Sequence, residues 1–187
     1  MTLPAVAHSG KMTGPPTRCI LACLLLLLPV SLAAQHDERS VRAAFVFHLT
    51  KYVEWSNPKN ELVIGFAGDG TMGETLRKVL DGKNSDGRTL RVLLSPSDEQ
   101  LQQCDLLYVA YSTRQKTRDV LSRLQGKNIL TLGETGDFAR DGGMVGLVRD
   151  ADQIQIQINL VATQSAGFKL SSRVLNLAVI VRSKDGN

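Results

Sequence analysis

The sequence predicts an α/β fold: a mostly parallel sheet flanked by helices, with a C-terminal antiparallel hairpin and a final helix. Three observations predict this class. Short apolar runs alternate with helical patterns of about ten residues. One late segment alternates strictly between apolar and polar residues. The composition, 43% hydrophobic and 21% charged over 187 residues, is that of a globular protein, and no repeat or composition break marks a second folded domain.

The first 33 residues have the three parts of a secretory signal peptide. Lys11 and Arg18 supply positive charge, an apolar run follows, and small residues precede a predicted cleavage after Ala33. The apolar run is shorter than the ~20 residues that a membrane-spanning helix needs. We therefore expect a cleavable leader over 1–33, export from the cytoplasm and one folded domain over 34–187.

Removing the predicted leader changes the charge and the cysteine count. The formal charge falls from +4 to +2, because the leader holds two basic residues and no acidic one. Met1 and Met12 both remain candidate start residues. Cys104 is the one cysteine left, and its place before an apolar strand predicts a buried, unreactive thiol rather than an intermolecular bridge. The low aromatic content, 5%, argues against a nucleic-acid partner.

The elements of the predicted domain can be read in order. An amphipathic first helix is expected between Asp37 and Glu54, because apolar residues recur at helical spacing before Pro58. Strands and helices then alternate, which is typical of crossover units in a parallel sheet. The expected strands are 62–67, 90–94, 106–111 and 129–132, and the expected helices are 71–80, 96–103 and 114–124.

The last third of the chain changes character. Residues 144–148 and 153–160 flank the turn 149–152, and isoleucines alternate with amides in the second run. This period of two predicts a hairpin with one face in the core and an amide-rich face in water. Gln155 and Gln157 lie on the amide-rich face.

The chain is expected to end in a helix. Ser171 or Ser172 supplies an N-cap. Apolar residues at helical spacing would form its inner face, namely Val174, Leu175, Ala178 and Val181.

A glycine-rich turn joins the first strand to the following helix. The segment 68–73 matches G-x-G-x-x-G in that context, but no acidic residue stands about 20 positions further on to bind a ribose. Two interpretations stay open. Gly68, Gly70 and Gly73 let strand and helix pack closely, or the turn, with Asp69, binds an anion or small ligand at the helix N-terminus.

Catalytic and metal-binding residues are scarce. The predicted domain has two histidines, His36 and His48, and His48 falls on the apolar face of the first helix, so we expect it to be buried or partly buried. No nucleophile elbow is present, and the common metal sites need more His and Cys. We predict a non-enzymatic protein without cofactor or metal. Four carboxylates near predicted strand ends could hold Mg²⁺ if they converged: Asp69, Asp105, Glu134 and Asp137.

The end of the first helix carries the one tryptophan of the chain. The Trp55 ring either closes the core or anchors a partner. We predict that the exposed parts of Tyr52, Glu54 and Trp55, together with Gln155 and Gln157, contribute to partner contacts.

Several short motifs follow one another over essentially the whole predicted domain, at 41–45, 51–55, 137–138, 142–144, 158–160 and 166–172. Taken together and in this order, they resemble the YfiR family of periplasmic proteins. The resemblance implies a compact α/β sandwich, often a homodimer. It also implies a periplasmic repressor that binds the periplasmic sensor part of an inner-membrane diguanylate cyclase and keeps cyclic-di-GMP synthesis low.

The resemblance implies further partners. An OmpA-like outer-membrane lipoprotein sequesters the repressor in that system, and other members of the family occur beside sensor kinases. Some members carry paired cysteines that form disulfides, but Cys104 has no second cysteine to pair with in the predicted domain. We therefore expect a regulatory adaptor. The alternative is a periplasmic small-ligand module, for a nucleotide or an aromatic compound, that uses the Gly68–Gly73 turn; a hydrolase using Asp69 or Asp137 ranks last.

Overall fold

The structure, a computed structural model, describes residues 30–55 and 59–184, with side chains from Glu38 onward. The chain divides into two compact units, Met1–Gln35 and His36–Asn187. The second unit holds every strand that the structure describes. The predicted leader falls almost wholly outside the described residues, which begin with Val30 in helix α2 (Val30–Lys51).

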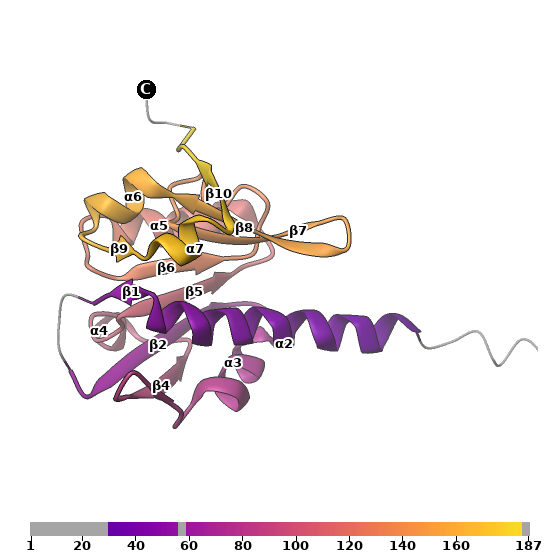
Figure 1. The fold of residues 1–187 in the computed structure, drawn as a ribbon, viewed down its shortest axis with the longest axis horizontal. Helices are drawn as coiled ribbons and strands as arrows, with labels where there is room; N and C mark the ends of the chain where they lie inside the picture. The colour runs from indigo at the N-terminus through magenta and orange to yellow at the C-terminus, as the bar shows by residue number, and fades with distance from the viewer. Residues whose placement is uncertain (1–29, 56–58, 185–187) are drawn as a thin grey trace, which may run out of the picture. The chain divides into compact units, whose positions relative to one another are not determined.

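Among the described residues, eight strands form the central sheet in the order β10-β8-β7-β6-β5-β2-β4-β3, and a two-stranded sheet joins β1 to β9 (Figure 1). The strands are β1 (Val53–Glu54), β2 (Glu61–Gly68), β3 (Asn84–Ser85), β4 (Arg88–Leu94), β5 (Leu106–Ala110), β6 (Leu130–Gly133), β7 (Val145–Asp150), β8 (Gln153–Asn159), β9 (Lys169–Leu170) and β10 (Ala178–Val181). The helices besides α2 are α3 (Met72–Leu80), α4 (Asp98–Leu101), α5 (Arg114–Leu124), α6 (Leu160–Ser165) and α7 (Ser172–Leu175).

The predicted fold class is confirmed. Strands β4, β2, β5, β6 and β7 are mutually parallel. Strands β7 and β8 form the predicted antiparallel hairpin, in which Val145 lies opposite Ile158. The turn residue Ala151 has a positive φ of 50°, as a tight hairpin turn requires.

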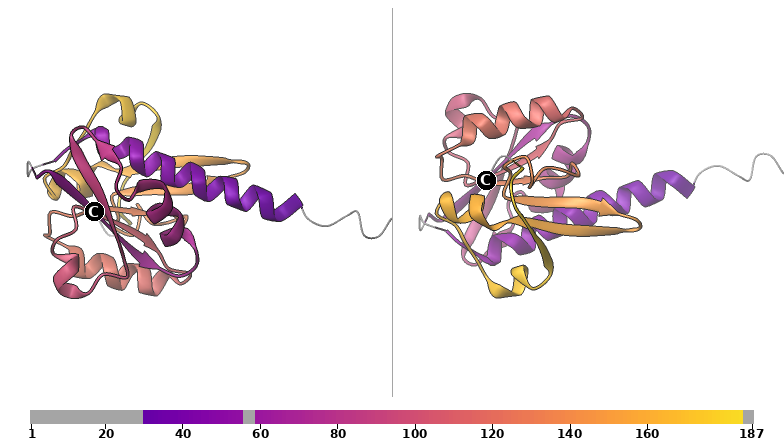
Figure 2. Two further views of the ribbon diagram at one scale, coloured as in Figure 1. Left: turned by 90° about the horizontal axis from the view of Figure 1, so that it is seen from below. Right: turned by 90° about the horizontal axis from the view of Figure 1, so that it is seen from above.

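Two apolar clusters cover the two faces of the sheet. One cluster unites α2 and α3 with the sheet and includes Leu49, Leu76 and Tyr108. The other joins α5 to the opposite face and includes Leu107 and Val120. Neighbouring residues of β5 therefore belong to different layers, as strand geometry demands. Figure 2 shows α2 and α5 on opposite sides of the sheet.

The predicted final helix is wrong in its second half. Helix α7 is one turn long and ends at Leu175, and Ala178 and Val181 lie in strand β10 instead. Strand β10 pairs with β8 in parallel, with Ala178 opposite Ile156. Three of the four residues of β10 are Val or Ile, which fit a half-buried strand better than a helix.

The structure also contains elements that the sequence patterns did not predict. These are the short strands β1, β3 and β9 and helix α6. Residue Leu160, predicted to end a strand, begins α6, because the Asn159 side chain caps that helix by accepting a hydrogen bond from the Ala162 amide at 3.0 Å.

Candidate functional site

The glycine turn between β2 and α3 is closely packed. A Cβ on Gly68 would lie 2.5 Å from the Ala110 carbonyl oxygen, and a Cβ on Gly73 would lie 2.5 Å from the Phe66 ring. Gly70 has a φ of +82°, which a side chain disfavours. These contacts support the interpretation that the glycines allow strand and helix to approach.

Asp69 ties this turn to the loop after β5. Its carboxylate accepts hydrogen bonds from the Ser112 amide at 3.1 Å and the Ser112 hydroxyl at 2.8 Å. These bonds, the backbone one first, lower the pKa of Asp69 below its ordinary value. A negative charge therefore stands beside the turn, where an anionic ligand would be repelled. The ligand-binding role of the turn stays a prediction that this geometry does not favour.

The four carboxylates named for Mg²⁺ have separate partners. Asp105 accepts from the Val63 amide at 2.8 Å, Glu134 accepts from the Tyr108 hydroxyl at 2.9 Å, and Asp137 pairs with Lys184 at 3.0 Å. Asp105 directly precedes β5, whereas Asp69 follows β2, so the two lie at opposite ends of parallel strands. Within residues 30–55 and 59–184, no group of three His, Cys, Asp or Glu side chains could hold a metal ion.

Trp55 is tied to the core at the end of α2. Its indole N–H donates to the Thr50 carbonyl at 2.8 Å, and its ring meets Phe168 edge to face, with 5.8 Å between the ring centres. Beside it, Val53 pairs with Leu170 in the small β1–β9 sheet. These contacts favour the core-closing role of Trp55, while Tyr52 stays half-buried and Glu54 is exposed.

The two halves of the predicted partner surface lie on different faces of the sheet. Ile154 and Ile156 pack against the cluster that contains α2. Successive side chains of a strand point to opposite faces, so Gln155 and Gln157 face away from α2. Gln157 donates its amide to Gln155 at 2.9 Å. Tyr52 and the amide face therefore cannot form one continuous patch.

Sequence reasoning missed a groove between α2, β8 and α7. It encloses about 430 Å³ and is lined by the apolar side chains of Phe45, Leu49, Tyr52, Ile156, Val174 and Leu177. Its two other lining residues are His48 and Arg173.

His48 is exposed at this groove, so the prediction of a buried or partly buried histidine is wrong. The apolar face of α2 is wider than the part that the core covers. One signal for this site was available in the sequence. It is a basic residue, Arg173, placed directly before apolar residues near the end of the chain.

The predicted burial of Cys104 is confirmed, and its low reactivity stays a prediction. The thiol is 3% exposed, and burial raises its pKa to about 11. The thiol donates to the Gln100 carbonyl oxygen, 3.5 Å from Sγ. A group with so little thiolate at neutral pH is a poor nucleophile.

None of the described helices combines the length and the apolar character needed to cross a membrane.

Comparison with known proteins gives one family match. Residues 39–179, more than half of the chain, match the model of a family described as YfiR/HmsC-like. No curated protein matches the chain. Among solved structures, the chain is similar to the ABC domain in complex with L-Trp from Streptococcus pneumonia, with 15% identity and a TM-score of 0.49. The match covers 72% of this chain and 58% of that one.

Proposed function

Because the chain belongs to the YfiR/HmsC-like family, we propose that it is a periplasmic adaptor that binds the sensor region of an inner-membrane diguanylate cyclase and represses it. Proteins of this family are periplasmic regulators of diguanylate cyclase signalling rather than enzymes. The observation that carries the proposal is the extent of the family match, which runs from α2 into the first half of β10 and includes the other strands of the central sheet in full.

A rigid adaptor can control a membrane enzyme by binding one of its conformations. Such control needs a difference in affinity between the active and inactive forms of the partner. The sheet, covered on both faces by apolar clusters, provides a stiff body on which surface contacts keep fixed positions. Repression then follows if the adaptor favours the inactive sensor conformation, which lowers cyclic-di-GMP.

The proposal includes the other partners that the family resemblance implies. A sensor kinase is the alternative membrane partner, an OmpA-like outer-membrane lipoprotein is the proposed sequestering partner, and a homodimer is the proposed assembly. The predicted leader over 1–33 would deliver the chain to all of them.

A deletion strain tests the proposed function. Loss of the gene should raise cellular cyclic-di-GMP, because the cyclase loses its repressor, and the full-length chain should restore the low level. A variant without residues 1–33 is the matched control, because it should fold in the cytoplasm and fail to restore. Unchanged cyclic-di-GMP in the deletion strain would refute repression, and restoration by the leaderless variant would refute action in the periplasm.

A second experiment decides which face meets the partner. On one face, Gln155→Ala combined with Gln157→Ala removes the amide pair. On the other face, Tyr52→Ala and Glu54→Ala change the segment that follows α2. Binding to the purified sensor region is measured, with the exposed Gln125→Ala as control. We expect the substitutions on one face to weaken binding to the sensor region and those on the other face to leave it unchanged.

Trp55→Ala completes the set, because Trp55 also closes the core. Binding that survives in a folded Trp55→Ala protein would remove Trp55 from the interface. Full binding by all of these variants would contradict the predicted contact residues, while leaving the deletion test of repression intact.

A further inference from the structure

The groove between α2, β8 and α7 has the size of a small-molecule site. Its volume of about 430 Å³ falls within the range of roughly 300–1,000 Å³ found for ligand pockets. Apolar side chains from segments far apart in the sequence, such as Phe45, Ile156 and Leu177, converge on it. Such a lining favours an apolar ligand.

The apolar lining is incompletely covered by the protein itself. Leu177 is 75% exposed, the largest exposed fraction among the large apolar side chains of the described chain. Helix α7 ends at Leu175, and β10 starts at Ala178. Leu177 therefore stands in the short link between them. Covering such a side chain with an apolar ligand removes apolar surface from water, which is favourable.

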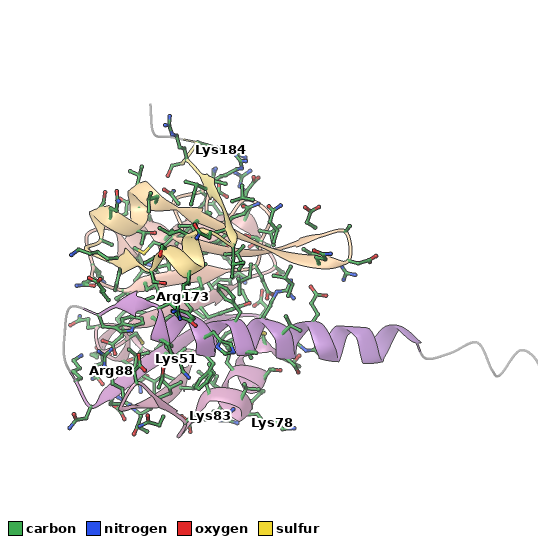
Figure 3. The ribbon with its side chains drawn as sticks, in the orientation of Figure 1. Lys51, Lys78, Lys83, Arg88, Arg173 and Lys184 are labelled. Carbon is green, nitrogen blue, oxygen red and sulfur yellow. The ribbon has the colours of Figure 1, made fainter. Side chains whose placement is uncertain are left out.

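One side of the groove is cationic. Arg173 lines it, is exposed, and forms no ion pair with any residue whose side chain the structure describes. Figure 3 labels the Arg173 side chain, which extends from α7. No lining residue is acidic.

We propose that this groove binds a medium-chain fatty acid, with the apolar chain among Phe45, Ile156 and Leu177 and the carboxylate on Arg173. A guanidinium group is suited to this role, because its planar fork donates two parallel hydrogen bonds to a carboxylate. The binding role is separate from the proposed repression, and either one can fail without the other.

Calorimetry with octanoate and 1-octanol tests the ligand class, because the two probes share the apolar chain and differ in the charged head. Octanoate should give saturable heat, and octanol should bind at least about tenfold more weakly, as expected for loss of a charged hydrogen bond. Equal affinities, or no saturable heat with octanoate, would overturn the proposal.

Variants locate the site. Arg173→Gln should weaken octanoate binding by about tenfold and leave octanol binding unchanged. Arg182→Gln removes an exposed arginine that does not line the groove, and it should leave both affinities unchanged. Leu177→Ala, at a largely exposed position, should weaken both probes. Octanoate binding that is unaffected by Arg173→Gln and Leu177→Ala would place the ligand elsewhere.

Two other occupants are distinguished in the same samples. Sedimentation that shows a dimer dissociated by Leu177→Ala would make the groove an interface between two copies. Binding to phosphatidylglycerol vesicles without binding to octanoate would make it a membrane contact. Either result would overturn the fatty-acid proposal.

Discussion

Tyr108, in the central strand β5, donates a hydrogen bond from its hydroxyl to the Glu134 carboxylate, with 2.9 Å between the two oxygens. Tyr108 is fully buried. Burial, strengthened by the nearby Glu134 charge, raises the pKa of Tyr108 well above its ordinary value, so the phenol remains protonated and keeps donating. Arg42 of α2 lies 3.7 Å from the same carboxylate and connects it to Glu38 at 2.7 Å. This chain of polar contacts links the sheet to the helix that covers it.

Replacing Tyr108 by Phe should lower the free energy of unfolding by about 1 kcal/mol, because one hydrogen bond is lost while the ring still fills its place. Tyr111→Phe is the matched control, since that hydroxyl makes no hydrogen bond within the described chain, and it should change stability little. Urea denaturation measures both. Equal effects of the two substitutions would mean that the Glu134 contact adds nothing.

The glycine turn predicts a packing effect. Gly68→Ala should destabilise the protein by about 1–3 kcal/mol, because the new Cβ would overlap the backbone of Ala110 in the neighbouring strand. Gly136→Ala adds the same methyl group where nothing lies within 4 Å, and it should be nearly neutral. Thermal denaturation of both variants measures the difference. A stable Gly68→Ala protein would reopen the ligand-binding interpretation of the turn.

Asp141 should make stability depend on acid. Its side chain is 2% exposed and accepts hydrogen bonds from Arg114 at 2.6 Å and Arg118 at 2.9 Å. These bonds, that from Arg114 above all, lower the pKa of Asp141. A lowered folded-state pKa contributes stability above the ordinary value near 3.8, and this contribution is lost as the pH falls through the folded-state pKa.

Asp141→Asn should therefore cost about 1–2 kcal/mol at neutral pH, since the arginines are partly solvated. The difference in the free energy of unfolding between this variant and the natural protein should disappear as the pH falls below 3.8. Urea titrations between neutral pH and acid measure it. Arg123→Gln, on the same helix but without a contact to Asp141, is the control. A gap that stays constant with pH would contradict the ionic origin.

The Cys104 thiol should resist alkylation in the folded protein. It is buried, and its pKa of about 11 leaves little thiolate at pH 8. Iodoacetamide should react slowly with the native protein and quickly in urea, as followed by mass spectrometry. Gln102→Cys combined with Cys104→Ala moves the thiol to an exposed position two residues away, and it should react at once. Rapid native labelling of Cys104 would show that the segment before β5 opens readily.

Local patterns predicted most of the sheet, because each buried strand is a short apolar run bounded by turn residues. They failed at Ala178–Val181, where four apolar residues after a one-turn helix fit both periods. The strand is selected over the helix because β8 has an edge on which β10 can pair. That pairing depends on the tertiary structure and cannot be read from neighbouring residues in the sequence.

The candidate sites were harder to predict than the strands. The Asp69–Ser112 contact depends on the pairing of β2 with β5, and the groove needs residues from α2, β8 and α7. The hairpin alternation identified Gln155 and Gln157 as one face, but only the packing of Ile156 against the α2 cluster shows that this face points away from Tyr52.

The small β1–β9 sheet sets a limit on the order in which the protein can fold. Val53 pairs with Leu170, more than a hundred residues later in the chain. Strand β1, which follows α2, therefore cannot pair with β9 until almost the whole polypeptide is present. Closing so long a loop also has an entropic cost. During synthesis, a nascent chain would therefore leave β1 unpaired until Lys169 and Leu170 have been made.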